Sequence, residues 1–214
     1  MLLGCLAAVA QTSKQLRDSL SVINNIISTT PYSADMHLRK AAINIQLLEW
    51  EYAIDEYSLV LRHDSTNIAA LFYRAYANNH LRRYELSIND YNALLCRLPR
   101  NLEARLGLAN CYIKMNKLQD AMAQMNILVE QHPDSAIVYV ARADLAKSQG
   151  YYDMSLLDWE MALRLKPKVI EYIVSKAEVY LLKGDKRKAK KTLDVALENG
   201  AHRYALRGWY DKCK

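Results

Sequence analysis

Apolar residues recur along this chain every three or four positions in short runs, with polar residues between them. This spacing places the apolar side chains on one face of a helix. The first clear run predicts an amphipathic helix over Lys14–Ser28, and Pro31 lies just beyond its end. The apolar positions of this run are separated by four, three and four residues: Leu16, Leu20, Ile23 and Ile27.

From residue 34 onward the pattern repeats every 34 residues. The period is marked by Pro or Ser at equivalent positions: Pro31, Ser65, Pro99, Pro133 and Pro167. The sequence therefore divides into five repeats, which cover residues 34–67, 68–101, 102–135, 136–169 and 170–201. Each repeat is expected to fold as two helices joined by a short turn. A fixed period of this length is typical of a solenoid, so we predict an all-α solenoid in which each repeat packs on its neighbours.

Certain positions of the repeat keep one kind of residue throughout. The eighth is always alanine: Ala41, Ala75, Ala109, Ala143 and Ala177. The twentieth is always small: Ala53, Ser87, Ala121, Ser155 and Ala189. A large side chain at either position would hold two crossing helices apart, so we expect the helices of a repeat to cross here. The twenty-fourth position is always large and is expected to face the core: Tyr57, Tyr91, Met125, Trp159 and Leu193.

The turn between the two helices is expected at the fifteenth position of each repeat. Gly150, Gly184 and Asn116 occupy it in three repeats, and these residues accept the left-handed conformation that often ends a helix. Leu48 and Arg82 occupy it in the first two repeats. Because leucine and arginine disfavour that conformation, we expect those two turns to be built differently.

Composition agrees with helices and excludes a β-sandwich. The chain has 51% hydrophobic residues but only six Gly and four Pro, too few turn residues for many short strands. Its formal charge of +6 arises from 29 basic and 23 acidic residues and favours anionic partners only weakly.

Four cysteines, at positions 5, 96, 111 and 213, show no metal-binding spacing. Cys96 and Cys111 are expected to be small buried hydrophobic residues. If the protein is exported, a disulfide between these two is the alternative.

Residues 1–10 are apolar throughout and too few to span a bilayer. They resemble a signal-peptide remnant, because Ala8-Val9-Ala10 has the small-residue pattern of a cleavage site. The residues up to Cys5 also resemble a lipobox, and only lipidation there would attach the protein to a membrane. The alternative is the first helix of the array. With either interpretation, residues 11–33 are expected to form the N-terminal helix of a partial repeat. The signal interpretation predicts the periplasm or cell envelope, and its alternative predicts the cytoplasm.

The repeat resembles that of the tetratricopeptide repeat (TPR) family, whose motif has an aromatic residue, Leu, Gly or Ala, Tyr, Ala, an aromatic residue, Ala and Pro. In the third repeat these positions hold Arg105, Leu108, Ala109, Tyr112, Ala121, Met125, Leu128 and Pro133. The departures are basic residues in the Leu position and Asn in the Tyr position: Lys40, Arg74, Arg142, Lys176, Asn44 and Asn78. The resemblance implies a right-handed α-solenoid of helix-turn-helix repeats.

In members of the family that this repeat resembles, fixed positions of each repeat line a concave groove that takes an extended peptide or a partner helix. Transferred to this sequence, the resemblance implies the groove residues Phe72, Tyr76, Asn79, Leu106, Asn110, Ile113, Val140, Asp144 and Lys147. The asparagine amides would bond a peptide backbone, and the two aromatic residues would form a side-chain pocket. Some of these residues alternatively only pack helices together. The function implied is a protein–protein interaction scaffold or assembly factor.

Several other classes of function are disfavoured. The carboxylate clamp of chaperone-binding members requires Lys, Asn and Arg in fixed positions. In the first possible frame these hold Leu38, Ala42, Tyr73, Glu103 and Gly107, so we expect no such chaperone partner. The five histidines are scattered and no Gly-rich phosphate loop or nucleophile elbow is present, so we expect no enzyme activity, cofactor or metal. His37 lies in an aromatic position of the motif and is expected to pack rather than catalyse.

The C-terminal part is the source of the alternative function. A basic run begins at Lys183, and its other members are Lys186, Arg187, Lys188, Lys190 and Lys191. Such a run could bind an anionic surface or nucleic acid, although a solvated last helix is the simpler interpretation and no aromatic residues interleave to stack bases. Residues 202–214 are expected to form a capping helix, or alternatively an exposed docking strip. Self-association through its Trp209 and Tyr210 is a further alternative.

Overall fold

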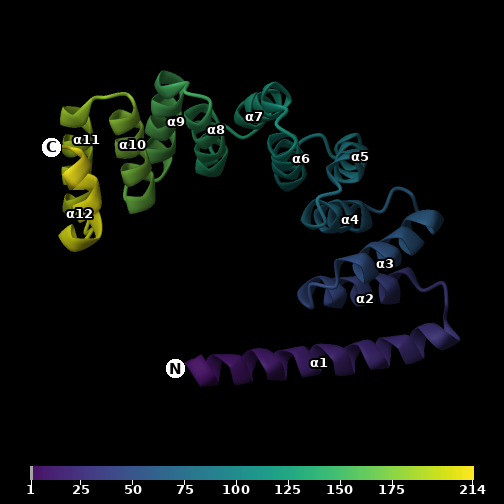
Figure 1. Cartoon of the computed structure of the whole chain (residues 1–214). Helices are drawn as coiled ribbons and strands as arrows, with labels where there is room; N and C mark the ends of the chain where they lie inside the picture. Colours follow the sequence, from purple (N-terminus) through teal and green to yellow (C-terminus); the bar gives the residue numbers. More distant parts are fainter. Residues whose placement is uncertain (1) are drawn as a thin grey trace. The chain divides into compact units, whose positions relative to one another are not determined.

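The computed structural model describes the backbone of residues 2–214 and the side chains of residues 12–214. Within this part of the chain every regular element is a helix, in agreement with the predicted all-α repeat solenoid (Figure 1). The helices are α1 (Leu2–Thr29), α2 (Ala34–Gln46), α3 (Trp50–His63), α4 (Ile68–His80), α5 (Tyr84–Leu95), α6 (Leu102–Lys114), α7 (Leu118–Gln131), α8 (Ala136–Ser148), α9 (Tyr152–Leu165), α10 (Ile170–Leu182), α11 (Lys186–Glu198) and α12 (Arg203–Lys212). The side chains of the suggested signal-peptide remnant, Cys5 included, lie outside the described residues.

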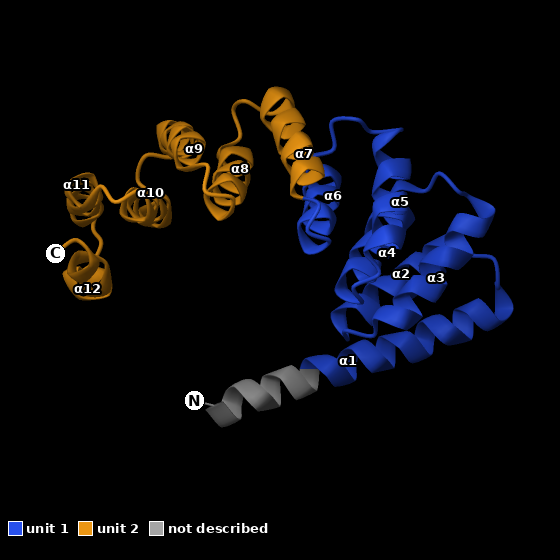
Figure 2. Cartoon of the chain, turned by 45° about the horizontal axis from the view of Figure 1, so that its top comes forward, with its two compact units in different colours: residues 1–117 blue, residues 118–214 orange. Residues whose placement is uncertain are grey.

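The helices form two compact units, residues 1–117 and residues 118–214 (Figure 2). In unit 1, α2 pairs with α3 and α4 with α5, while α1 packs on α2 and α6 on α5. In unit 2, α8 pairs with α9 and α10 with α11, while α7 packs on α8 and α12 on α11. Each unit is thus built of helical hairpins that pack on the next hairpin in the chain.

The first helix of every repeat begins at the first residue of the 34-residue period: Ala34, Ile68, Leu102, Ala136 and Ile170. The residue before it caps the helix in unit 1. The side chains of Ser33, Asn67 and Asn101 accept hydrogen bonds from backbone N–H groups three residues further on. Each satisfies one of the donors that a helix leaves free at its start. These caps fix the helix starts through local contacts.

In the four hairpins that lie within one unit, the small residues lie where the paired helices cross, as predicted. The pairs Ala41 with Ala53 and Ala177 with Ala189 are fully buried. In the other two hairpins a serine hydroxyl also donates to the facing backbone, from Ser87 to the carbonyl of Ala75 and from Ser155 to that of Ala143, at 2.7 and 2.8 Å. A larger side chain would break these contacts, which explains the restriction to Ala and Ser.

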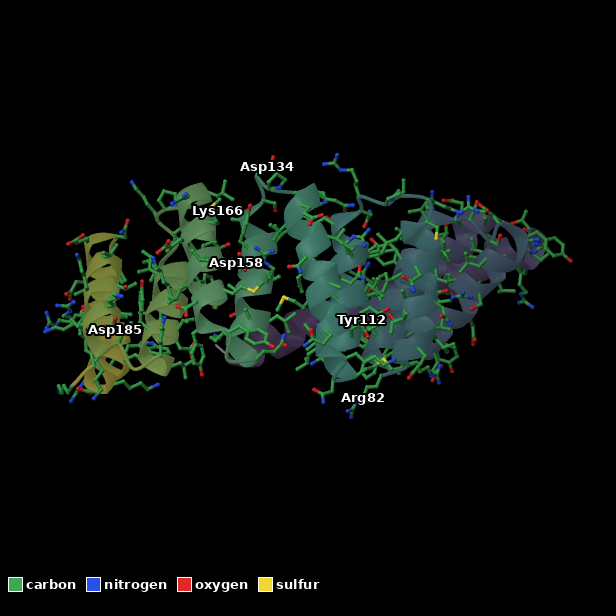
Figure 3. The ribbon with its side chains drawn as sticks, turned by 90° about the horizontal axis from the view of Figure 1, so that it is seen from above. Arg82, Tyr112, Asp134, Asp158, Lys166 and Asp185 are labelled. Atoms are coloured by element: carbon green, nitrogen blue, oxygen red, sulfur yellow. The ribbon has the colours of Figure 1, made fainter. Side chains whose placement is uncertain are left out.

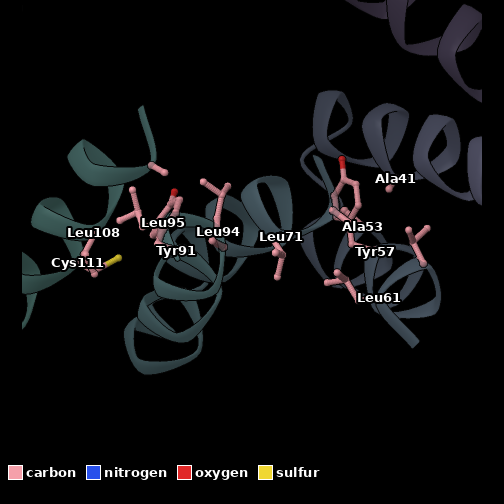
Figure 4. Close-up of a cluster of buried hydrophobic side chains, with 14 residues drawn as sticks. Ala41, Ala53, Tyr57, Leu61, Leu71, Tyr91, Leu94, Leu95, Leu108 and Cys111 are labelled. Carbon is pink, nitrogen blue, oxygen red and sulfur yellow. The ribbon is translucent and has the colours of Figure 1, made fainter. Parts of the chain in front are cut away.

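Large side chains of the second helices fill the cores. In unit 1, Tyr57 and Tyr91 are buried in a cluster that continues from hairpin to hairpin (Figure 4). Burial raises the pKa of both phenols far above its ordinary value. In unit 2, Leu193 and Leu206 belong to a cluster against which Trp209 also packs. Helix α12 therefore covers the last apolar face of its unit.

The turns at Leu48 and Arg82 are built like the others, so the sequence-based expectation for them is wrong. Leu48 has φ 61° and Arg82, labelled in Figure 3, has φ 60°, close to the 57° of Asn116. All three turns close with the same two backbone bonds. At Leu48, its own N–H donates to the carbonyl of Ile45, and the N–H of the next residue donates to Asn44, at 3.0 and 2.8 Å. These two bonds define a Schellman motif, and they offset the strain of a non-glycine residue in the left-handed backbone conformation.

Ion pairs explain the basic residues that depart from the family motif. A basic residue at the seventh position pairs with an acid sixteen residues later, on the second helix of the same repeat. The pairs are Lys40–Glu56 at 2.7 Å, Arg74–Asp90 at 2.7 Å and Arg142–Asp158 at 2.8 Å. In the last repeat, where that acid is replaced by Thr192, Lys176 pairs with Glu160 of the preceding repeat at 3.0 Å. The charges are mostly buried and need these partners.

The cysteine expectations are partly corrected. Cys111 is fully buried, as predicted, but Cys96 is exposed because it caps the end of α5 instead of facing the core. Both thiols are free, and so is that of Cys213. His37 is packed as expected, and its Nδ1 lies 2.5 Å from a carboxylate oxygen of Glu56. Among the described residues, no helix is both long enough and apolar enough to cross a membrane.

Candidate functional site

The first helices of successive repeats lie next to one another in unit 1, where α4 contacts both α2 and α6. Six of the predicted groove residues lie on α4 and α6: Phe72, Tyr76, Asn79, Leu106, Asn110 and Ile113. Tyr76 and Asn110 are exposed and the other four are half-buried. We call the face formed by these residues, together with Trp50 and His80, the α4–α6 surface.

An aromatic cluster forms one part of the α4–α6 surface. The ring of Trp50 stacks on that of His80, with centroids 4.1 Å apart and planes 3° from parallel. Tyr76 meets both rings edge-on, at 6.0 Å from Trp50 and 4.6 Å from His80. Tyr76 remains 38% exposed. Its neighbours hold the phenol in place, so the cluster presents a fixed aromatic surface with a polar hydroxyl to solvent.

Trp50 was not among the predicted site residues. It is the first residue of α3 and therefore belongs to a second helix, whereas the family positions that were transferred all lie on first helices. It follows the turn within the first repeat, at the start of the helix that packs on α4. The large half-buried indole is an ordinary feature of binding surfaces, because it combines apolar area with a polar N–H.

Asparagine side chains form the second part of the surface. The Nδ2 of Asn79 donates to the Cys111 sulfur at 3.1 Å and lies 3.5 Å from the Oδ1 of Asn110, at the long limit for a hydrogen bond. Desolvation raises the pKa of the Cys111 thiol, which therefore remains neutral. Asn79 is thus held by the protein, while Asn110 is exposed and keeps its amide group available.

Phe72 mainly packs helices together. It contacts the ring of Tyr73 at 5.2 Å and that of buried Tyr91 at 6.0 Å, and it borders the core cluster of unit 1. Of the two aromatic residues expected to form a pocket, Tyr76 is therefore the one that faces solvent. Tyr73, 45% exposed and stacked on Tyr57, is a further aromatic residue that the prediction did not include.

The other three predicted residues, Val140, Asp144 and Lys147, lie on α8 in unit 2. Lys147 forms ion pairs with two acidic residues: its Nζ lies 2.7 Å from a carboxylate oxygen of Glu178 and 3.3 Å from one of Asp144. Burial lowers the pKa of Lys147, but the hydrogen bond and charge of Glu178 and the charge of Asp144 outweigh it, so the pKa is raised. This lysine links α8 to α10 and has little freedom to meet a ligand.

A spacing of 31 residues connects these contacts. The twelfth residue of one repeat meets the ninth residue of the next in both units, as Asn79 meets Asn110 and Lys147 meets Glu178. Both contacts could have been predicted from the sequence, because the two residues of each pair are 31 positions apart and complementary in hydrogen bonding or charge. Among the described residues, no group of three or more His, Cys, Asp or Glu side chains could hold a metal ion.

Comparison with known proteins found a matching family model, a human relative and solved structures of similar fold. Residues 80–145 match the model of the tetratricopeptide repeat family. The human protein O-mannosyl-transferase TMTC1 is 27% identical over 117 residues, which is 55% of this chain but only 13% of that protein. The chain thus spans a small part of the length of this relative.

Two solved structures have the same fold. The crystal structure of MamA has a TM-score of 0.69 and 19% identity over 78% of this chain and 91% of MamA. That of YrrB, described as a TPR protein with an unusual peptide-binding site, has a TM-score of 0.66 and 18% identity over 87% of this chain and 96% of YrrB. Residues 80–145 therefore match tetratricopeptide repeats, and the two solved structures share the helical-repeat fold over most of the chain.

Proposed function

We propose that this protein is a non-enzymatic scaffold that binds an extended peptide or a helix of another protein on the α4–α6 surface. The observation that supports this most directly is the cluster of Trp50, Tyr76 and His80 beside the exposed amide of Asn110. The TPR fold, which generally serves protein–protein interaction, supports the same class of partner. The likeness to YrrB, with its peptide-binding site, favours a peptide.

The two parts of the surface have different roles in this proposal. The aromatic cluster is fixed by its own ring contacts, so a ligand side chain can bury area against it without ordering it first. The Asn110 amide offers both a donor and an acceptor, which match the two polar groups of any peptide unit. The surface would therefore set an approximate position for a peptide backbone and prefer an apolar or aromatic side chain next to Tyr76.

Selected peptides test this function. Random linear peptides are selected on the wild-type chain, and their affinities are then measured for Tyr76→Ala combined with Asn110→Ala. Both side chains are exposed, so the variant should fold normally. Loss of an aromatic anchor typically costs about 2 kcal/mol or more, so we expect binding to weaken more than tenfold.

Tyr52→Ala is the matched control. Tyr52 lies on α3 in the same unit and is 64% exposed, but it takes no part in the aromatic cluster. Its replacement should leave the affinity within about twofold. If the control weakens binding as much as the double variant does, or if the double variant binds normally, the α4–α6 surface is not the binding site.

A further inference from the structure

The net charge of the chain is confined to its last 32 residues. Residues 183–214 contain ten Lys and Arg but only four Asp and Glu. Residues 1–182 contain nineteen of each and are formally neutral, so this last segment accounts for the whole charge of +6. A modest total charge therefore conceals a strongly cationic end of unit 2.

The basic residues of α11 and α12 border one seam between these helices. The Tyr210 hydroxyl donates to an oxygen of Asp194 at 2.7 Å and joins the two helices. The guanidinium of Arg203 lies over the Tyr210 ring at 5.6 Å. Further along the seam, the charges of Lys186 and Lys190 act to lower the pKa of the Cys213 thiol, although burial raises it overall. Basic groups from both helices thus lie along the same line of contact.

Most of these cations have no acidic partner. Lys183, Lys188 and Lys214 pair with Asp153, Asp185 and Asp211. The other seven are exposed and form no ion pair among the described residues: Lys186, Arg187, Lys190, Lys191, Arg203, Arg207 and Lys212. We call the part of α11 and α12 that carries these seven side chains the α11–α12 surface. Figure 3 shows side chains projecting from the helices at this end of unit 2, near the labelled Asp185.

The α11–α12 surface is hollowed along one side of α12. A cleft of about 450 Å³ is lined by Arg203, Tyr204, Arg207, Tyr210, Asp211 and Lys214. Its walls contain two arginines four residues apart, whose Cα atoms lie about 6 Å apart along the helix axis. Alternate side chains of an extended chain project on one side at intervals of about 6.5 Å. The two arginines therefore match carboxylates that are two residues apart in an extended segment.

We propose that the α11–α12 surface binds an acidic, extended segment of a partner protein, with its Asp or Glu side chains at Arg203 and Arg207. A guanidinium offers two parallel N–H groups that fit the two oxygens of a carboxylate. Tyr204, 88% exposed, provides a phenol beside this cleft for packing or hydrogen bonding. The remaining lysines strengthen attraction at longer range.

Other polyanions fit the same surface less well. Insertion into a lipid surface requires free apolar side chains, but Leu206 and Trp209 are used in the core of unit 2. Asp194 and Asp211 lie within the surface and would repel a continuous row of phosphates. A peptide can place its separate carboxylates between these two acids. The surface lies on other helices than the α4–α6 surface, so either proposal can fail without the other.

The experiment uses a fluorescent peptide of about a dozen residues with alternating Glu and Ser, so that carboxylates project from one side. Binding to the full chain is measured by fluorescence anisotropy at low and at physiological salt. We expect Arg203→Gln combined with Arg207→Gln to weaken binding about tenfold, equivalent to ~1.4 kcal/mol. Wild-type binding should also weaken as salt rises.

The control removes the same charge elsewhere in unit 2. Lys166 and Lys168 are exposed in the connection between α9 and α10, so Lys166→Gln combined with Lys168→Gln changes the net charge equally. This control should weaken binding less than twofold. Equal weakening by both variants would mean general charge attraction and overturn the proposal. So would tighter binding to phosphatidylserine vesicles or to a single-stranded oligonucleotide than to the peptide. Circular dichroism of each variant checks that it is folded.

Discussion

The pair formed by Arg142 and Asp158 allows a quantitative test of how this chain uses charge inside its repeats. The guanidinium Nε and Nη2 donate to the two oxygens of Asp158 at 2.9 and 2.8 Å, and Nη1 donates to Asn126 at 3.0 Å. The side chains are only 19% and 3% exposed. The hydrogen bonds that Arg142 donates to Asp158 raise the pKa of Arg142, so the guanidinium stays charged at any ordinary pH.

Asp158→Asn leaves this buried cation without its counter-charge. Removal of one partner of a buried pair costs about 3–5 kcal/mol. Because Arg142 keeps some contact with water and its bond to Asn126, we expect a loss of about 2–3 kcal/mol in the free energy of unfolding. The measurement is urea unfolding of the full chain followed by circular dichroism, with wild type and variant compared at the same protein concentration.

The double replacement Arg142→Leu with Asp158→Gln provides the decisive comparison. The third repeat has Leu108 and Gln124 at these two positions, so the repeat sequence itself tolerates the neutral combination. Replacing a whole buried pair by packed neutral residues is often neutral in stability, so we expect a change within about 1 kcal/mol. If the double variant is as unstable as Asp158→Asn, the pair stabilises the hairpin by itself and the reasoning is refuted.

Three further predictions concern the backbone at two positions and the phenol of Tyr210. Leu48→Gly should stabilise unit 1 by about 1 kcal/mol, because glycine has no strain at φ 61°; an unchanged or lower melting temperature would contradict this. Gly107→Ala should destabilise by about 1–3 kcal/mol in urea, although alanine favours helices, because its Cβ would lie 2.4 Å from the buried Tyr91 ring; a gain in stability would show that the ring moves aside. Burial and the bond to Asp194 raise the pKa of Tyr210 to about 12. The raised pKa stabilises the folded chain below pH ~10, and this contribution is lost as pH rises towards the pKa of Tyr210 in the folded chain. Phenolate absorbance should therefore show that Tyr210 ionises at higher pH in the folded chain than in the unfolded chain. The Tyr210→Phe variant identifies its signal, and ionisation of Tyr210 at the ordinary pH of a tyrosine would contradict the prediction.

The fold was largely predictable because the repeat expresses it in local terms. Small residues such as Ala41 and Ser87 recur where helices cross, and the period gives the helix starts directly. The turns at Leu48 and Arg82 could not be predicted from residue preference alone. The strain of a left-handed residue is about 1–2 kcal/mol, and the two backbone bonds of the Schellman motif compensate for it once the hairpin forms.

The candidate site was less predictable because it depends on contacts between repeats. Transfer of family positions identified Tyr76 and Asn110, which face solvent, but also Phe72, which packs in unit 1, and Lys147, which is paired in unit 2. It missed Trp50, since that residue belongs to a second helix. The position of a residue in the motif shows which way its side chain points. It does not show whether another residue of the protein already binds that side chain.

The most direct test of the proposed function is the nuclear magnetic resonance signal of the Trp50 indole N–H during titration with a selected peptide. The chain has three tryptophans, and Trp159 is buried while Trp209 packs in unit 2, so each indole reports on a different place. If the peptide binds at the α4–α6 surface, the Trp50 signal should shift as peptide is added, and the titration curve should give the dissociation constant of the peptide. The signals of the other two tryptophans should stay unchanged. A Trp50 signal that does not move on saturation with peptide would contradict the account.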